Sequence, residues 1–586
     1  MNAKQRDARI RKFRERLFRH ASSAVADLHR TRAERAAAPA CIRRDTPKDA
    51  LRIGIVGGGQ AGLYAASLLQ DLGIDFHIFE ASGERLGGRV LTWYFDDAPH
   101  QYAEMGAMRF PDNFMQDRLF KTWSYLNETA PRTQGAREIP KIPYVLFDGN
   151  PELRAGNLLC FNGEKPVTGN EAKRDNALLG FDAAFADAKY DYFKHADGKL
   201  KSAGELLDAA LEPFIKLLDS VPDDGDGAER AWKALLEFNG YSARAYLQEV
   251  GDGERPYPVA IVDYMETVNS YTGIYDLSFI ELVLDTYVFD GAERWFAMDG
   301  GTSRITDELA NRLPADKITM GAEVFELEQL EDGALIHYRM GPGVPTRSER
   351  FDRVIVTLPF SVLKFVQTPR TWSKGKYDAM RMLKMTNAVK IALGFKSRFW
   401  EKPGPYSQGM RGGQSNTDLT VRSVVYPSFG IGEPGPAYIL GSYAWQDDAD
   451  KWSHLSQQEM LEAALRDVAR LHGEEIVRSE YLGHGKAVVW NRQRLAGGGF
   501  EFFAAGQFGE TFVQAREPEG AFHFAGEHLD MVHYWIAGSF NSAFRTVWEA
   551  LILEGLDTEK NLETLRESMG GGDILPTMIP RFHGAG

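Results

Sequence analysis

Cysteine is scarce in this chain of 586 residues, which holds only Cys41 and Cys160. Two cysteines cannot build a disulfide framework, and this scarcity is typical of proteins in a reducing cytoplasm. The sequence lacks the CxxC and HExxH spacings of common zinc sites, so we expect no bound metal. We find no apolar run of 18 or more residues and therefore expect no membrane span. The low cysteine content therefore predicts a cytoplasmic protein.

Positive charge is scarce outside the N-terminal segment. The net charge is −14, but residues 1–44 contain 13 Lys and Arg against 4 Asp and Glu, a net +9 that leaves −23 for the remainder. Such an acidic body argues against nucleic acid as the main partner. The basic segment, residues 1–48, has high helix propensity, and no apolar signal-peptide core follows it. A membrane-surface helix, a targeting peptide and a frayed helix are alternatives. We favour an arm docked on its own subunit or on a neighbour in a homo-oligomer, a dimer or larger.

Residues 51–80, LRIGIVGGGQAGLYAASLLQDLGIDFHIFE, have the order strand, glycine turn, helix, strand, acid. Leu51–Val56 is a short apolar run with β-branched residues, and Asp75–Glu80 is a second strand candidate. Ala61–Leu72 between them has apolar residues at helical spacing. A GxGxxG turn precedes this helix, where glycines give a tight turn, room for a pyrophosphate and close helix–strand packing. The segment therefore predicts a dinucleotide site.

The glycines of this turn are Gly57, Gly59 and Gly62. A pyrophosphate would lie at the helix N-terminus, where free N–H groups and the helix dipole favour an anion. Glu80 follows Gly62 by 18 residues, where a carboxylate can bind a ribose 2′-hydroxyl. The next segment, Gly83–Val90, has a second glycine pair, which suggests the further phosphate contacts of a flavin dinucleotide. A surface loop with a C-capping glycine is the alternative for this segment. A nicotinamide dehydrogenase is a separate alternative for the whole chain.

The rest of the chain predicts a mixed α/β fold. Helical patterns occur at Ala203–Leu218, Ala228–Phe238, Ala260–Asn269 and Leu277–Tyr287. Strands are predicted at Glu323–Leu327, Ala334–Tyr338, Arg353–Leu358, Ala388–Phe395 and Ala437–Trp445, and Ala521–Ala550 repeats the order strand, glycine turn, long helix. We therefore predict a dinucleotide domain built from separated segments (49–92, 290–365 and 515–560), a mixed-sheet substrate domain (93–150 and 366–514), a helical insertion (151–289) and a tail (561–586).

Seven motifs follow one another between residues 50 and 555. They are GGGQAGL with Glu80, Gly87-Gly88-Arg89, Glu104–Phe110, Val354–Pro359, Lys390-Ile391 with Phe399-Trp400, Ser442–Ala449, and Phe524–His528 with Tyr534–Ile536. In this order they resemble the flavin-containing amine oxidase superfamily, and within it the L-amino acid oxidases and the bacterial group of phenylalanine 2-monooxygenase and lysine oxidase/monooxygenase. The resemblance implies noncovalent FAD, because covalent attachment in this superfamily uses a cysteine and neither cysteine here lies in a flavin motif.

The resemblance also implies which residues would hold the cofactor. Diphosphate and ribose would be bound by Gly57, Gly59, Gln60, Ala61, Gly62, Glu80 and Ala81. The remaining cofactor contacts would come from Arg89, Gly106, Ala107, Met108 and Arg109 beside the cofactor and its ring, the Val324 backbone at the adenine, Glu527 at the ribityl–phosphate end, and Trp535 and Ile536 near the ring.

Two charged residues in apolar surroundings bear on the chemistry. Arg109 could bind a substrate carboxylate with both arms of its guanidinium, or form a structural salt bridge with a buried acid. The resemblance favours the carboxylate, with Tyr443 adding a hydrogen bond. Lys390 lies in an apolar strand, where a charge is costly unless it is paired. The resemblance places it at flavin N5 through a water, where it would aid reoxidation by oxygen, whereas an edge-strand lysine that blocks aggregation is the alternative.

The substrate side chain is the least determined part of the site. Trp535 would line the channel and the Tyr534 carbonyl would receive the amine. Trp445, Phe500 and Phe502 are candidates for the side-chain pocket, with core packing as the alternative. These aromatic residues suit an aromatic or long apolar substrate. A buried acid among Asp263, Glu266 and Glu501 would favour a basic one, although all three could be solvated. We lean towards a basic or long side chain.

The implied reaction is oxidative deamination of an L-amino acid. Hydride passes from Cα to flavin N5, and the products are a 2-oxo acid, ammonia and hydrogen peroxide, with oxygen as the second substrate. A 2-monooxygenase that decarboxylates its substrate to the amide, an amine or polyamine oxidase, and a flavin-bearing scaffold protein are the alternatives.

Overall fold

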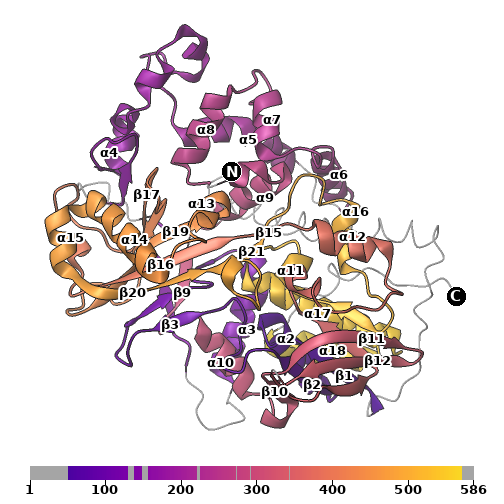
Figure 1. Cartoon of the computed structure of the whole chain (residues 1–586). Coiled ribbons are helices and arrows are strands. Elements are labelled where there is room, and N and C mark those ends of the chain that lie inside the picture. The colour runs from indigo at the N-terminus through magenta and orange to yellow at the C-terminus, as the bar shows by residue number, and fades with distance from the viewer. Residues whose placement is uncertain are drawn as a thin grey trace.

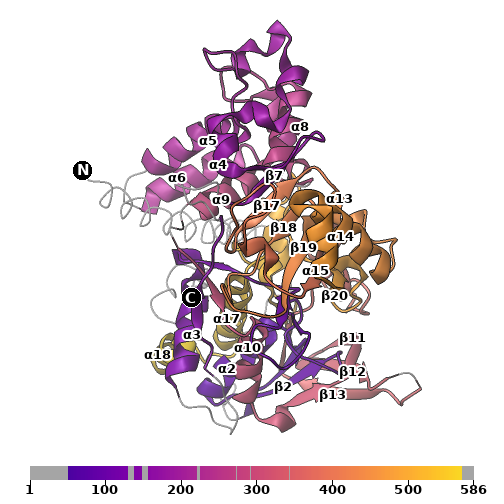
Figure 2. The ribbon, with the colours of Figure 1, turned by 90° about the vertical axis from the view of Figure 1, so that its left-hand side faces the viewer.

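The computed structural model describes residues 50–129, 138–147, 156–220, 225–271, 273–290, 292, 294–341 and 343–570. The predicted basic arm, residues 1–48, and the glycine-rich end of the predicted tail, residues 571–586, lie outside this range. The fold is mixed α/β, as predicted. A group of helices forms one end of the molecule, a parallel sheet lies at the opposite end, and a larger sheet lies between them (Figures 1 and 2).

The parallel sheet is assembled from separated segments, which confirms the prediction. Its strand order is β10-β2-β1-β14-β22. The strands are β10 (Ile318–Met320), β2 (Asp75–Glu80), β1 (Arg52–Val56), β14 (Arg353–Val356) and β22 (Phe522–Phe524). The residues of β14 and β22 are all buried, as expected where helices and loops cover both faces of a parallel sheet. Helix α2 (Gln60–Leu72) follows β1 and packs against α17 (Ile536–Leu553).

The second sheet has seven strands in the order β20-β16-β19-β18-β17-β7-β8. They are β20 (Tyr481–Val489), β16 (Ala388–Phe395), β19 (Ala437–Trp445), β18 (Ser423–Val425), β17 (Gln414–Thr417), β7 (Leu158–Cys160) and β8 (Val167–Thr168). Every residue of β16 is buried, because the strand pairs on both sides and packs on both faces. Strands β7 and β8 fall in the range predicted as helical, so the helical insertion begins after Thr168.

The four predicted helices of the insertion are present. They are α5 (Ala203–Ser220), α6 (Gly225–Leu236), α8 (Val259–Val268) and α9 (Phe279–Asp290), joined by α7 (Ala243–Glu249). Two other predicted boundaries differ from the structure. Strand β9 (Trp295–Met298) pairs with β5 (Phe110–Pro111) and β6 (Lys141–Pro143) rather than with the parallel sheet. Helix α18 (Glu559–Glu567) packs against α2, so the predicted tail begins inside the fold.

The described residues form further helices and strands besides these. They are β3 (Thr92–Tyr94), β4 (Tyr102–Glu104), α3 (Asp117–Glu128), α4 (Gly169–Arg174), α10 (Ser303–Asn311), β11 (Glu323–Leu330), β12 (Gly333–Arg339), β13 (Arg347–Phe351), α11 (Phe360–Leu363), α12 (Lys374–Met382), β15 (Met385–Thr386), α13 (Gln446–Asp450), α14 (Gln457–His472), α15 (Glu474–Glu480), β21 (Phe500–Glu501) and α16 (Glu510–Arg516).

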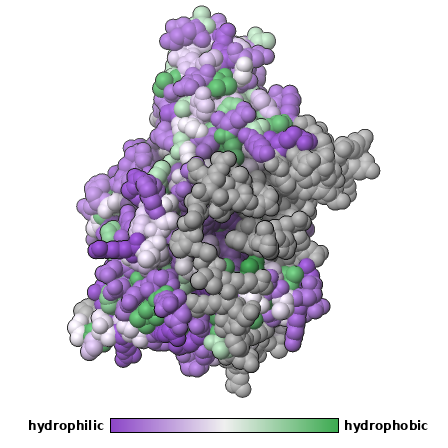
Figure 3. Space-filling model, turned by 90° about the vertical axis from the view of Figure 1, so that its right-hand side faces the viewer, coloured by the Kyte–Doolittle hydropathy of each residue, from purple (hydrophilic) through white to green (hydrophobic). Residues whose placement is uncertain are grey.

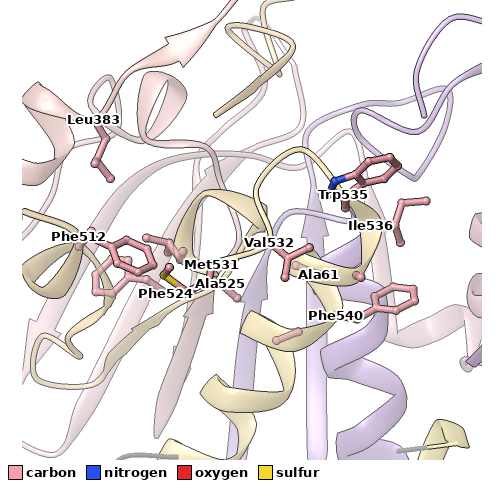
Figure 4. Packing of buried hydrophobic residues seen from close by; sticks show 14 of the residues in the cluster. Ala61, Leu383, Phe512, Phe524, Ala525, Met531, Val532, Trp535, Ile536 and Phe540 are labelled. Atoms are coloured by element: carbon pink, nitrogen blue, oxygen red, sulfur yellow. The ribbon is translucent and has the colours of Figure 1, made fainter. Parts of the chain in front are cut away.

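The largest buried hydrophobic cluster joins the parallel sheet to the helices of the insertion. Figure 4 shows part of this cluster, in which Phe524 of β22 lies near Phe512 and, farther along, Phe540 of α17 lies near Ala61 of α2. On the face in Figure 3, hydrophobic side chains form small separate patches among hydrophilic ones. Within the described ranges, no helix is long and apolar enough to cross a membrane.

Candidate active site

A cavity of about 950 Å³ extends from the glycine turn after β1 to the interior strand β16. Most of the predicted cofactor residues line it, namely Gly57, Gly59, Gln60, Ala61, Glu80, Ala81, Arg89, Gly106, Ala107, Val324, Glu527, Trp535 and Ile536. Gly62, Met108 and Arg109 do not. Gly62 packs beneath the turn, and the other two line a smaller adjoining pocket.

The glycine turn has the shape that a pyrophosphate needs. Gly57 has a φ of +107°, which disfavours any side chain. A Cβ on Gly62 would lie 2.0 Å from the Gly57 carbonyl oxygen, so only glycine fits this helix–strand contact. A Cβ on Gly59 would meet nothing within 4 Å. The turn therefore leaves open space at the N-terminus of α2, where an anion is favoured.

Glu80 is held beside this turn at the end of β2. Its two carboxylate oxygens accept backbone N–H groups, Oε2 from Gly58 at 2.7 Å and Oε1 from Ser82 at 2.7 Å. Burial raises the pKa of Glu80, and these hydrogen bonds counteract the rise. The carboxylate is thus fixed at the cavity wall, and the residues present here fit a dinucleotide with a free ribose hydroxyl.

An ion pair that the sequence did not predict crosses the cavity wall. The Arg89 guanidinium, from the loop after β2, donates to Glu527 Oε1 at 2.6 Å, although 438 residues separate the two. Glu527 Oε2 accepts the backbone N–H of Tyr534 at 2.7 Å. Tyr534 has a φ of +56°, a rare conformation for a residue with a side chain. The Glu527 carboxylate thus fixes the loop that leads into α17.

Lys390 is buried in an interior strand, so the edge-strand interpretation is wrong. Its Nζ donates to the carbonyl oxygens of Gly106 at 2.6 Å and Glu104 at 3.1 Å. It also lies 4.6 Å from the centre of the Tyr443 ring. Burial lowers the pKa of Lys390 to about 7 and raises that of the Glu104 carboxyl to about 7. A lysine with such a pKa can exchange a proton at neutral pH.

A smaller pocket of about 80 Å³ adjoins the cavity at Lys390, Tyr443 and Trp535, which line both. All seven predicted substrate residues lie around it, namely Arg109, Tyr443, Trp445, Phe500, Phe502, Tyr534 and Trp535. The structure therefore brings together these seven residues from four separate parts of the sequence at one end of the cavity.

The Arg109 side chain is mostly enclosed by aromatic rings. Its guanidinium carbon lies 6.0 Å from the centre of the Tyr144 ring and 5.8 Å from that of Trp295. Nη1 donates to Gln414 Oε1 at 3.3 Å. The residue is only 9% exposed. In such surroundings water screens the guanidinium weakly, so it interacts strongly with an anion that enters the pocket.

The three acids that the sequence suggested for the pocket do not line it. Asp263 and Glu266 form ion pairs with Arg244. Glu501 is buried behind the pocket, and burial raises its pKa to about 8. The pocket acid is instead Asp285 of α9, which sequence reasoning missed. The signal was a pair of acids, Glu281 and Asp285, four residues apart in a largely apolar helix, but the sequence does not tell which way that helix face points.

Comparisons with known proteins agree with this geometry. The model of the flavin-containing amine oxidoreductase family matches residues 60–551. A protein of Dictyostelium discoideum, provisionally named a bifunctional amine oxidase, is 35% identical over 532 residues, which cover 86% of this chain and 47% of that protein. The chain thus spans about half the length of that relative. An L-amino-acid oxidase of Siganus canaliculatus is 30% identical over 510 residues, 86% of each chain. Cyclohexylamine oxidase from Brevibacterium oxydans has the same fold, with a TM-score of 0.60 at 18% identity over 87% of this chain and 100% of that one.

Proposed function

Because this chain belongs to the flavin-containing amine oxidoreductase family, with FAD as its cofactor, we propose that it is an L-amino acid oxidase. The overall reaction converts an L-amino acid, oxygen and water into a 2-oxo acid, ammonia and hydrogen peroxide. The position of the cavity supports noncovalent binding of FAD, since Cys160 is buried in β7 and is not among the lining residues.

Arg109 is the observation that carries the choice of an amino acid over an amine. A guanidinium matches a carboxylate in charge and in the spacing of its donors. Arg109 lines the pocket that adjoins the cofactor cavity, and so does Tyr443, which would add a second contact to the substrate carboxylate. A substrate without a carboxylate would use neither group.

The chemistry divides between the cofactor and the protein. FAD, when bound, supplies the acceptor for the hydride of Cα and the reaction with oxygen. In our proposal, Arg109 and Tyr443 orient the carboxylate, the Tyr534 carbonyl receives the neutral amine, and Trp535 limits the channel. Lys390 holds or releases a proton at Nζ near neutral pH. The reducing compartment and the homo-oligomeric state stay predictions.

The test is peroxide release by the purified yellow protein across twenty L-amino acids and several amines, with mass spectrometry of the products. Peroxide and a 2-oxo acid from an L-amino acid support the proposal. An amide with carbon dioxide would instead make the enzyme a 2-monooxygenase. Turnover restricted to amines without a carboxylate would contradict the role of Arg109.

A further inference from the structure

Glu104 is a buried acid to which the proposed mechanism gives no part. It ends β4, two residues before Gly106, which lines the cofactor cavity. Glu104 itself lines neither this cavity nor the substrate pocket, but a separate pocket of about 40 Å³. A buried carboxyl costs free energy unless hydrogen bonds or an opposite charge compensate. The contacts of Glu104 therefore indicate why an acid lies so close to the cofactor cavity.

Two hydrogen-bond donors fix the Glu104 carboxylate. Its Oε2 accepts the Thr92 hydroxyl at 2.8 Å, and its Oε1 accepts the backbone N–H of Thr302 at 2.6 Å. Thr302 immediately precedes α10, so the carboxylate lies at the N-terminus of this helix, where the helix dipole favours a negative charge. These contacts favour the charged form and counteract burial, which raises the pKa of Glu104 to about 7. Glu104 can thus carry a negative charge near neutral pH.

The backbone of the same segment holds the Lys390 side chain. Lys390 Nζ donates to the carbonyl oxygens of Glu104 at 3.1 Å and of Gly106 at 2.6 Å. These carbonyl groups orient the ammonium, but they are neutral and do not cancel its charge. Lys390 lines both the cofactor cavity and the substrate pocket. Glu104 therefore helps to fix Nζ at the place where the cavity and the pocket meet.

The groups around Nζ act on its charge in opposite directions. Burial lowers the pKa of Lys390 most, the Glu104 carboxylate raises it, and the Arg109 guanidinium lowers it. The centre of the Tyr443 ring lies 4.6 Å from Nζ, and the face of an aromatic ring favours a cation. Burial raises the pKa of the Tyr443 hydroxyl, so this phenol stays neutral. Among the residues that the structure describes, Glu104 is thus the acid that favours a proton on Nζ.

We propose that Glu104 is a positioning residue for Lys390: its carbonyl oxygen holds Nζ in place, and its carboxylate keeps Nζ protonated. The inference rests on the proposed function, because it needs oxygen as the electron acceptor. Oxygen becomes hydrogen peroxide by taking two electrons and one proton from the reduced cofactor and one proton from Nζ. Solvent then returns a proton to Nζ. Glu104 acts on this reaction only through Lys390.

The first test removes the charge of Glu104 and keeps its size. Glu104→Gln retains an oxygen that can accept the Thr302 N–H, but without the negative charge the pKa of Lys390 should fall by about one unit. Stopped-flow absorbance follows the rate at which oxygen reoxidises the photoreduced holoenzyme. Because the protonated Nζ is the active form, this rate should fall as the pH rises through the pKa of Lys390. We expect the midpoint of this fall near pH 7 in the wild type and about one unit lower in the variant. The variant should then be roughly fivefold slower at pH 7 and nearly equal to the wild type at about pH 5.

The second test needs no turnover. The visible absorption of oxidised flavin responds to a change of charge beside it, so a pH titration of the resting holoenzyme should show the same two midpoints. Lys390→Met should show no such transition, and Glu104→Asp, which keeps the charge, should have a midpoint close to that of the wild type. Glu308→Gln is the matched control, because Glu308 is a buried acid of α10 that pairs with Arg312. Its midpoint should equal that of the wild type.

The outcomes separate this inference from the proposed function. If Glu104→Gln kept the wild-type midpoint, or lowered the rate equally at every pH, the role of the carboxylate would be overturned and the oxidase would remain. Should Glu104→Gln not bind FAD, Thr92→Val answers the same question, because it removes a donor that favours the charged carboxylate. It should also lower the midpoint, and an unchanged midpoint would overturn the inference. A wild-type enzyme that oxygen reoxidises no faster than free flavin would overturn the proposed function and this inference with it.

Discussion

Replacing Arg109 by methionine tests the proposed carboxylate site most directly. Methionine keeps an unbranched side chain between the Tyr144 and Trp295 rings but removes the guanidinium. A substrate carboxylate would then enter a nearly dry pocket without its cationic partner. We expect the variant to bind FAD normally, because Arg109 lines the substrate pocket and not the cofactor cavity.

The size of the effect follows from the burial of Arg109, which is 9% exposed. Removing one partner of a buried charge pair costs about 3–5 kcal/mol. Since every 1.36 kcal/mol corresponds to a factor of ten, kcat/KM for the preferred L-amino acid should fall by roughly 10²- to 10³·⁵-fold. An amine that lacks the carboxylate but has the same side chain should lose almost nothing.

The assay follows peroxide release for each amino acid and its decarboxylated amine with wild type and variant. Arg294→Met is the matched control. Arg294 is exposed, and it forms an ion pair with Asp112 next to the paired strands β5 and β9. If a fully loaded Arg109→Met enzyme kept kcat/KM for the amino acid within about threefold of wild type, the carboxylate assignment would be refuted. An equal loss for amino acid and amine would also contradict it.

Three further predictions concern other parts of the fold. Lys390→Met should slow the reoxidation of the reduced enzyme by oxygen about 100-fold and abolish the dependence of this rate on a group with a pKa near 7. Stopped-flow absorbance from pH 6 to 9 measures this rate. An unchanged pH profile would contradict the role of Nζ. Gly62→Ala places a Cβ 2.0 Å from the Gly57 carbonyl oxygen, so flavin absorbance per protein should fall strongly, and full FAD content would show that the turn can adjust. Burial lowers the pKa of His472 from 6.5 to about 4, so the folded state binds fewer protons there than the unfolded state does. As the pH falls from 6.5 to 4, the wild type should lose about 3 kcal/mol of unfolding free energy through this group, whereas His472→Gln should not. Denaturant titrations measure both, and the same pH dependence of stability in the two proteins would contradict the prediction.

The sequence predicted best where local sterics and strand patterns decide the structure. Strand β2 has the predicted bounds, Asp75–Glu80, and α2 starts within one residue of its predicted position. The same holds for β16 and β19, because a buried strand is an apolar run whatever its partners are. The predicted substrate residues lie around one pocket. We could name them from the sequence only because the resemblance supplied their roles, since their spacing in the chain does not indicate that they meet.

Features that depend on distant partners were not predictable. The ion pair of Arg89 with Glu527 joins loops that only the folded sheet brings together. Asp285 was missed because the direction of its helix face is set by packing against the Tyr534 segment. Glu266 was considered as a pocket residue, but it forms an ion pair with Arg244, which a hydrophobic pattern in the sequence does not reveal. Strands β7 and β8 were predicted as part of the helical insertion. Their place in the large sheet depends on pairing with a strand that is far away in the sequence, which local composition does not show.

The order of strands in the parallel sheet has a consequence for how the protein is made. Strand β1 lies between β2 and β14, yet Ile53 and its partner Arg353 are 300 residues apart. At a synthesis rate of about 5–20 residues per second, β1 waits roughly 15–60 s on the ribosome for this neighbour. Glu527 emerges later still, beyond β22. The cofactor site is therefore completed only after Glu527 has been synthesised, and until then a nascent chain must keep its first strands from aggregating without the help of FAD.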